Sequence, residues 1–510
     1  MIEILESRIA PAVILSLTLG KTGALLTEET ANPGDNSVSI TMDSSGALHV
    51  DPSDANTQIR FNGTLLPVGD QAVAPGFIGA FTAKLGAGND QITISGFLPG
   101  ATTVDLGIGS NALTLDAATL GAKLTVKGGT GADTVTFSGA TTRVFGGVNI
   151  ALGEGTNLLN NTTTALLHVG GDFIATSGKG ADDFLMAGKD VQILGKLGLT
   201  TGTGDDEAGF VVTGRLDVGG AATLKSGGLA GNRTDQKLNG ANVFIGGAVL
   251  MDIKTGRPDQ VILSAGTIFI GGAAKFTSGG TDNFGSVELG APTMGSPTTL
   301  HIGGSLSATT KSLDSEFDIL DVTFGSIVGG LNVNGFTSVA AELSGSIGGA
   351  VKVALAGAEL SGYFFLGTVL NAADPLHVGA VTVTTKNADS TLSLLKVIAQ
   401  GTVKITGTKG GDYFGADDTL FLAAATIDLG AGADQFGIES GTNPTGLTQV
   451  NAPLTLLGGG GVDTFDLSGA VANTTLNAIA TILIDGGAET DVLHLGATGN
   501  YQTKVVQKNI

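Results

Sequence analysis

The chain has 510 residues, with 83 Gly, 12 Pro and no Cys, and its 25 basic and 46 acidic residues give a formal net charge of −21. The lack of Cys excludes disulfides and thiolate metal sites, and the charge disfavours nucleic acid and anionic membranes as partners. Apolar residues make up 42% of the chain, and an apolar core combined with abundant Gly is typical of many short strands joined by tight turns.

Residues 1–80 are expected to form an N-terminal cap and incomplete first coils. Met1–Ile9 has the apolar spacing of a short capping helix. Ala12–Leu19 is apolar, but it is too short to span a membrane. Glu3 and Glu6, which precede it, are atypical of a secretory signal. We therefore expect no membrane span and infer export from the body of the chain.

Residues 81–290 repeat the phrase Gly-x-Gly-x-Asp-x-apolar, with Asn in some copies in place of Asp. Successive copies lie 21, 22, 24, 25 and 24 residues apart and place this residue at Asp90, Asn111, Asp133, Asn157, Asp182 and Asp206. A period of this length with strand patterning predicts coils of three short strands and three turns. The apolar residue two places after each Asp is expected to face inward and to stack along the core.

The turn is looser at Asp235, Asp259 and Asp282, and residues 291–400 keep only a second marker, an apolar residue followed by Gly-Gly. The Asp turn returns in residues 401–510, at Asp412, Asp434, Asp463 and Asp491. The whole pattern predicts an all-β fold, a right-handed parallel β-helix of roughly 18 coils with short terminal caps.

The full form Gly-Gly-x-Gly-x-Asp-x-apolar occurs at Gly128–Val135 and Gly458–Phe465. It resembles the calcium-binding nonapeptide of RTX-type secreted bacterial proteins, in which turn carbonyls and the Asp carboxylate hold Ca²⁺. The resemblance implies calcium ligands at Asp90, Asp133, Asp182, Asp206, Asp434 and Asp463. RTX repeats carry a motif about every nine residues, two per coil, whereas this chain has only one per coil.

The electrostatic argument for a cation is strongest at Asp182, Asp183, Asp205 and Asp206, where two successive copies carry paired acids. If these coils are neighbours, four carboxylates crowd together, and each pair about 5 Å apart repels by about 1 kcal/mol even in water. Ca²⁺ would relieve that repulsion. The alternative needs no metal, because Asp and Asn are good turn residues whose side chains bind backbone amides.

The sequence contains no evident catalytic grouping. All five His residues follow Leu and precede an apolar residue, which predicts outward-facing strand positions. The densest acidic cluster outside the Gly turns is formed by Asp314, Glu316 and Asp318, and we interpret it as a solvated insertion loop.

These observations predict a secreted or cell-surface structural or adhesive protein, such as an S-layer, fibre or matrix component, that self-associates or binds other surface components. Leu5–Ala12 is also similar to the start of large repeat-rich surface proteins of planctomycete-like and verrucomicrobial bacteria. The alternatives are a polysaccharide lyase or hydrolase built on a β-helix, and a passive repeat module. We expect no enzyme activity.

Overall fold

The computed structural model describes residues 13–30, 33–228, 233–280, 285–292, 298–311, 314–356, 361–368, 374–386, 389–439, 446–467, 476–496 and 500–510. They fall into two compact units. Unit 1 comprises Met1–Leu229 and Asp235–Gly240, and unit 2 comprises Ala230–Thr234 and Ala241–Ile510. Each unit is described below by itself.

Both units are built from stacked parallel coils, with 59% strand and 1% helix, which confirms the prediction of an all-β parallel solenoid. The turns number about 15, fewer than the roughly 18 expected. One cause is visible in the described residues: insertions lengthen some coils, so that Asp434 and Asp463 lie 29 residues apart.

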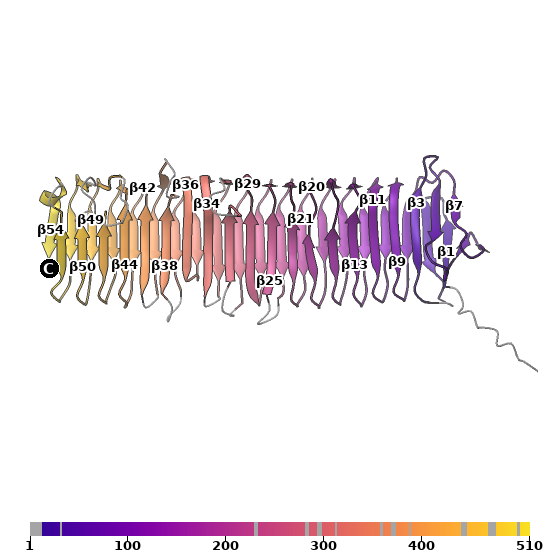
Figure 1. The fold of residues 1–510 in the computed structure, drawn as a ribbon, viewed down its shortest axis with the longest axis horizontal. Coiled ribbons are helices and arrows are strands. Elements are labelled where there is room, and N and C mark those ends of the chain that lie inside the picture. The colour runs from indigo at the N-terminus through magenta and orange to yellow at the C-terminus, as the bar shows by residue number, and fades with distance from the viewer. Residues whose placement is uncertain are drawn as a thin grey trace, which may run out of the picture. The chain divides into compact units, whose positions relative to one another are not determined.

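One coil of unit 1 shows the predicted three strands, each paired in parallel with the equivalent strand of the next coil (Figure 1). Residues with side chains on alternate faces form these strands, because Val, Thr, Leu and Phe suit a pleated, half-buried surface. The strands of this coil are β12 (Leu124–Lys127), β13 (Thr134–Ser138) and β14 (Thr141–Val144), and their partners are β15 (Val148–Ala151), β16 (Leu158–Asn161) and β17 (Leu166–Val169).

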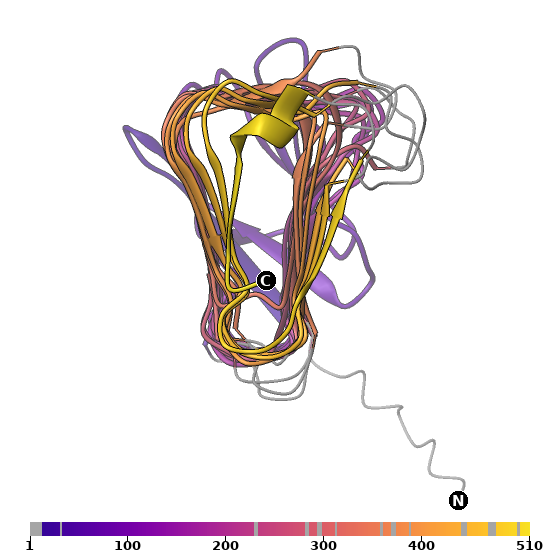
Figure 2. The ribbon, with the colours of Figure 1, turned by 90° about the vertical axis from the view of Figure 1, so that its left-hand side faces the viewer.

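Unit 2 repeats this arrangement, and its last coils superpose as closed loops when viewed along the stack (orange to yellow in Figure 2). The only helix among the described residues is a 3-10 turn, η1 (Asn500–Lys504). A representative coil consists of β43 (Val403–Thr406), β44 (Tyr413–Asp417) and β45 (Leu420–Phe421), paired in parallel with β46 (Ala425–Asp428), β47 (Gln435–Ile438) and β48 (Gln449–Val450).

The core consists of inward-facing residues stacked from coil to coil, as predicted for the position two places after each Asp. In unit 2 this position is occupied by Phe414, Phe436 and Phe465, all of them buried. The rings of Phe436 and Phe465 stack with centroids 4.6 Å apart. Such pairs contribute about 0.5–1.5 kcal/mol beyond their burial.

The first strands of unit 1 are hairpins: β1 (Val13–Leu19) pairs antiparallel with β2 (Gly23–Glu28), and β3 (Ser37–Met42) with β4 (Leu48–Pro52). β3 also pairs in parallel with β9 (Gln91–Leu98), where the regular coils begin. The predicted helix at Met1–Ile9 lies outside the described residues. Within the described ranges, no helix has the length and hydropathy to cross a membrane.

Candidate functional site

The Asp and Asn side chains of the turns point inward and form a hydrogen-bonded stack. We call the members in unit 1 the N-terminal Asx ladder: Asn36, Asp90, Asn111, Asp133, Asn157, Asp182 and Asp206, all of them buried. The backbone N–H of each member donates to Oδ1 of the next, at 2.8 to 3.2 Å. Each side chain therefore satisfies the turn amide of the preceding coil, which is otherwise a buried donor without a partner.

Asn and Asp alternate along most of this ladder, and the alternation has an energetic consequence. Nδ2 of Asn111 donates to Oδ1 of Asp133 at 3.0 Å, and Nδ2 of Asn157 donates to Oδ1 of Asp182 at 2.9 Å. Each of these carboxylates thus receives a side-chain donor from the preceding coil. Hydrogen bonds to charged acceptors are roughly twice as strong as neutral ones, so the alternation stabilises the buried charge.

The C-terminal Asx ladder in unit 2 comprises Asp412, Asp434, Asp463 and Asp491, with no Asn between them. The same amide bonds are present: Asp412 N–H donates to Asp434 Oδ1 at 2.7 Å, and Asp434 N–H to Asp463 Oδ1 at 2.9 Å. Oδ2 of Asp434 and Oδ2 of Asp463 are buried and have no hydrogen-bond partner within the described part of the chain. This ladder therefore stacks carboxylate on carboxylate, and its members supply no side-chain donors to one another.

Burial raises the pKa of these carboxyl groups. The pKa of Asp434 is raised to about 7 by desolvation, to which repulsion from Asp463 and Asp412 adds. Desolvation likewise raises the pKa of Asp90, Asp206 and Asp463 to about 6. It also raises the pKa of Asp133 and Asp182, which is opposed by their Asn donors.

The glycines of the motif let successive turns lie directly on one another. Gly131 has φ of 133°, a conformation that side chains rarely adopt. A Cβ atom there would also lie 2.1 Å from the carbonyl oxygen of Gly109 in the preceding coil. The turn amides and carbonyls then bond between coils, as Gly131 N–H does to Glu154 O at 3.0 Å.

The residues implied as calcium ligands fall into three groups. Asp90, Asp434 and Asp463 each keep a buried Oδ2 without a partner among the described residues. Asp133 and Asp182 have both carboxylate oxygens hydrogen-bonded within the protein. Asp206 accepts the Asp182 amide through Oδ1 and also keeps a buried Oδ2 without a partner among the described residues. Asp183 and Asp205 are exposed, so the four acids of these two turns do not converge.

The chemistry of this donor set fits a cation only in part. Carboxylate oxygens are the ligands that Ca²⁺ prefers, and it takes six to eight oxygens. Apart from Asp412, a ladder Asp offers at most one carboxylate oxygen that is not already used, and the turn carbonyls accept amides from neighbouring coils. In the described ranges, no group of three or more Asp, Glu or His side chains is arranged to hold a metal ion.

Strand register corrects the alignment of the looser copies. In unit 1, Asp235 pairs with Glu207 and not with Asp206. In unit 2, Asp259 pairs with Ser286, which pairs with Glu316. The positions level with the ladder are therefore Pro258, Gly285 and Ser315, and further along Thr337, Gly362 and Ser390. Asp282 lies outside the described residues.

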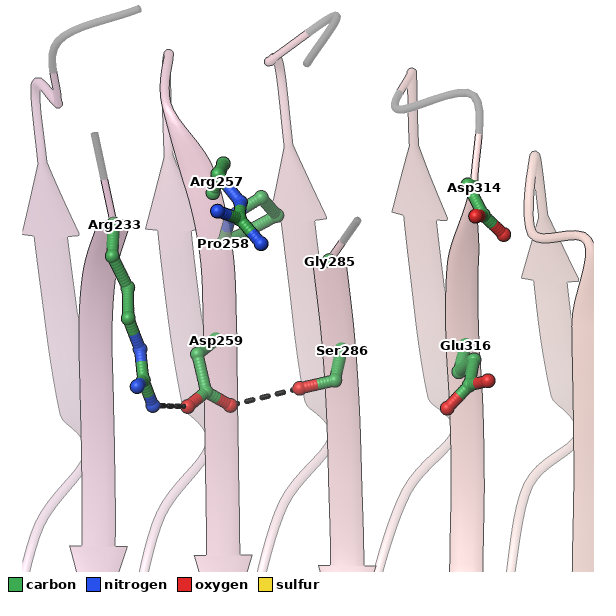
Figure 3. A pocket seen from close by; sticks show the side chains of 8 residues that line it. All are labelled: Arg233, Arg257, Pro258, Asp259, Gly285, Ser286, Asp314 and Glu316. Carbon is green, nitrogen blue, oxygen red and sulfur yellow. Dashed lines mark hydrogen bonds and ion pairs between the residues drawn. The ribbon is translucent and has the colours of Figure 1, made fainter. Parts of the chain in front are cut away.

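A polar groove of about 480 Å³ lies on unit 2 where the ladder is interrupted (Figure 3). Its floor is formed by β28 (Arg257–Leu263), β31 (Gly285–Gly290) and β34 (Ser315–Ile327). Arg233 forms an ion pair with Asp259 at 2.5 Å, and Ser286 Oγ donates to the same carboxylate at 2.8 Å. The other lining residues are Arg257, Pro258, Gly285, Asp314 and Glu316.

The acidic cluster near Asp314 was interpreted from the sequence as a solvated loop, and this was wrong for two of its members. Glu316 and Asp318 lie on β34, paired with Ser286 and Glu288 of β31. The pKa of Asp318 is raised to about 7, first by burial and then by repulsion from Glu316, Glu288 and Glu342. The sequence signal was the alternation of acids with Phe317 and Ile319, both buried, which is a strand pattern.

The His residues do not gather. His168 is half-buried between the inward-facing Leu167 and Val169, as expected for an outward strand position. His301 stacks on Phe269 with ring centroids 5.0 Å apart.

Comparison of the chain with protein-family models, with curated proteins and with solved structures gives no match.

Proposed function

We propose that the chain is a structural or adhesive component of a bacterial surface, an S-layer, fibre or matrix element that is secreted or held at the cell surface. The observation that supports this is the Asx ladder. The most regular residues of the sequence bind the backbone of the adjacent coil, so their chemistry stabilises the stack. A protein whose repeated residues act in this way is suited to a mechanical role.

Calcium belongs to this proposal as a stabiliser of the turns whose Asp keeps a buried oxygen without a hydrogen bond among the described residues. Where bound, it would be held by Asp90, Asp434 and Asp463, whose Oδ2 atoms lack a protein partner among the described residues. A cation there would neutralise the buried charge that Asn partly offsets at Asp133 and Asp182. The remaining oxygens would have to come from water, because the turn carbonyls bond to amides.

Thermal unfolding followed by circular dichroism, first in excess EDTA and then in millimolar Ca²⁺, tests the calcium component, and light scattering of the same samples tests self-association. We expect Ca²⁺ to raise the melting temperature and the particles to grow with protein concentration. An unchanged melt would refute the calcium proposal alone. A monodisperse monomer under all conditions, together with antibody labelling that fails on intact producing cells, would refute the surface role.

A second candidate, cleavage of polysaccharides, is favoured by Asp318. A carboxyl group with a pKa of about 7 is suited to donate a proton near neutral pH. Glu316 lies two residues away on the same strand face, which places the two Cα atoms about 7 Å apart. Inverting glycosidases separate their carboxyl groups by about 6.5–9.5 Å. Release of reducing ends from neutral polysaccharides that disappears in Asp318→Asn would establish this activity, and its absence would exclude it.

A further inference from the structure

The groove of Figure 3 coincides with a local departure from the repeat. Pro258 and Gly285 occupy positions that are level with the C-terminal Asx ladder, so the buried carboxylate is missing here. The Asp is absent from this position from Pro258 to Ser390, and within this stretch the groove marks a place where the local residues serve something other than stacking. Outward-facing charged side chains of both signs are concentrated at this place.

The side chains that line the groove indicate which class of ligand it fits. Pro258 and Gly285 are the only nonpolar residues among the eight that line the groove, which disfavours an apolar ligand. Two Arg and three acidic side chains give the groove a local formal charge of −1. With a net charge of −21 on the chain, a polyanion would be repelled. A lone metal ion is also disfavoured, since no suitable group of three acids is found among the described residues.

Donors and acceptors alternate across the groove. A guanidinium group only donates hydrogen bonds, a carboxylate only accepts them, and a Ser hydroxyl does both. Arg257 lies on β28, Ser286 on β31 and Glu316 on β34, so these groups span about 10 Å across three neighbouring strands. A ligand that carries many hydroxyl groups, each both donor and acceptor, matches this alternation over its whole length.

The groove is also preorganised. The ion pair with Arg233 and the hydrogen bond from Ser286 fix the carboxylate of Asp259. Its lining residues other than Asp314 project from paired strands, which hold a site more accurately than loops do. A volume of about 480 Å³ lies within the range of about 300–1,000 Å³ that is usual for small-ligand sites.

We infer that this groove binds a segment of a neutral glycan through the Arg257 guanidinium and the Asp259 and Glu316 carboxylates. The inference rests on the proposed surface role, because it supplies that role with an adhesive site. It identifies the ligand class only by hydroxyl chemistry and lack of charge.

Isothermal titration of the full chain with neutral hexasaccharides of glucose, mannose and N-acetylglucosamine, at millimolar concentration, tests the inference. At least one is expected to bind, and Arg257→Ala and Glu316→Gln should each weaken it at least about tenfold, as expected when a charged hydrogen-bond partner is lost. Arg215→Ala is the matched control. Arg215 forms an exposed ion pair with Asp217 in another groove, on unit 1, and its loss should leave binding unchanged.

Several outcomes would overturn the site. These are the absence of binding to every neutral glycan, binding that is equal in wild type and both groove variants, and equal or tighter binding of an alginate oligosaccharide. Circular dichroism of each variant confirms that it is folded. Light scattering of the same samples reports self-association separately, so a groove that fails to bind glycan while the chain still self-associates refutes the site and not the surface role.

Discussion

Replacing Asp434 with Asn tests the energetics of the Asx ladder directly. The new side chain keeps the Oδ1 acceptor for the Asp412 amide, a bond that is 2.7 Å long in the structure. It also places an Nδ2 donor where Asn111 has one, and Nδ2 of Asn111 donates to Asp133 Oδ1 at 3.0 Å. In the variant the equivalent acceptor is Asp463 Oδ1. The substitution removes a buried charge and adds a hydrogen bond, so we expect Asp434→Asn to stabilise the protein at neutral pH.

The magnitude follows from the pKa of Asp434, which burial and the neighbouring carboxylates raise from 3.8 to about 7. A difference of one in pKa corresponds to about 1.36 kcal/mol, so this change corresponds to about 4 kcal/mol in the absence of screening. The ladder lies directly beneath the turn surface, and solvent screening reduces the figure, so we expect about 2 kcal/mol at pH 8. At pH 4 the folded wild type is already protonated at Asp434, and the gain should vanish.

Thermal unfolding of both proteins at pH 4 and pH 8 in EDTA measures this difference. Because long repeat arrays do not always unfold in one step, hydrogen exchange at the Asp412 amide should be measured as a local readout. Asp434→Ala is the control: it removes the acceptor for that amide and should destabilise by about 1–3 kcal/mol at pH 4, and by less at pH 8, where it also removes the buried charge. An Asp434→Asn variant that is less stable at pH 8, or equally shifted at both pH values, would refute the reasoning. If Asp434→Asn is less stable than wild type only in buffer that contains Ca²⁺, the cation binds at Asp434.

Three further predictions follow from the same geometry. In wild type, the carboxyl groups whose pKa is raised to about 6 or 7 bind protons more tightly in the folded state than in the unfolded state. Their contribution to stability is therefore complete below about pH 4 and is lost as the pH rises through 6 to 7. The melting temperature in EDTA should fall from pH 5 to pH 8, and a rise would contradict the buried ladder. Gly131→Ala should lower the free energy of unfolding, measured by urea titration, by more than about 2 kcal/mol, because its Cβ would lie 2.1 Å from a carbonyl oxygen. Gly46 also has a positive φ but no atom within 4 Å of an added Cβ, so Gly46→Ala should cost only about 1 kcal/mol. Phe436→Ala should cost about 3–5 kcal/mol in the same assay, because the side chain is buried and stacked on Phe465, and a loss below 1 kcal/mol would show that the core closes over the gap.

The fold could be predicted from the sequence because the period of the sequence repeat equals the length of one coil. A spacing of 21 to 25 residues between turns fixes the length of a coil, and the apolar residue after each Asp fixes which face is inside. The looser copies were misaligned because Asp235 and Asp259 lie one residue beyond the inward-facing position. A shift of one residue in a strand moves a side chain to the opposite face, and the loosened Gly pattern around these copies was not enough to fix the register.

The direction of the Asp side chains was harder to predict than their positions. Acidic side chains of adjacent coils that lie close together repel one another, and a cation would relieve the repulsion. This electrostatic argument predicted a site at Asp182, Asp183, Asp205 and Asp206. The structure separates these four by the direction of their side chains, with Asp182 and Asp206 buried and Asp183 and Asp205 exposed. The inner pair binds amides, and the outer pair is solvated. Counting charges along the sequence does not distinguish buried from solvated carboxylates, because two adjacent Asp residues can point to opposite faces of the chain.

The composition of the ladder indicates what the position requires. Thr419 N–H donates to Thr448 Oγ1 at 3.1 Å, and Ser315 N–H to Thr337 Oγ1 at 3.2 Å, so a hydroxyl can replace the carboxylate as the acceptor for a turn amide. Stacking alone therefore requires an acceptor, not a charge. In the N-terminal ladder the cost of the charge is reduced by interleaved Asn. In the C-terminal ladder four Asp residues follow one another without that relief, although Asn, Ser or Thr would serve the amide equally well. The part of the chain where charge exceeds the structural need is thus Asp412 to Asp491, and a proton or a cation has its largest effect on stability there.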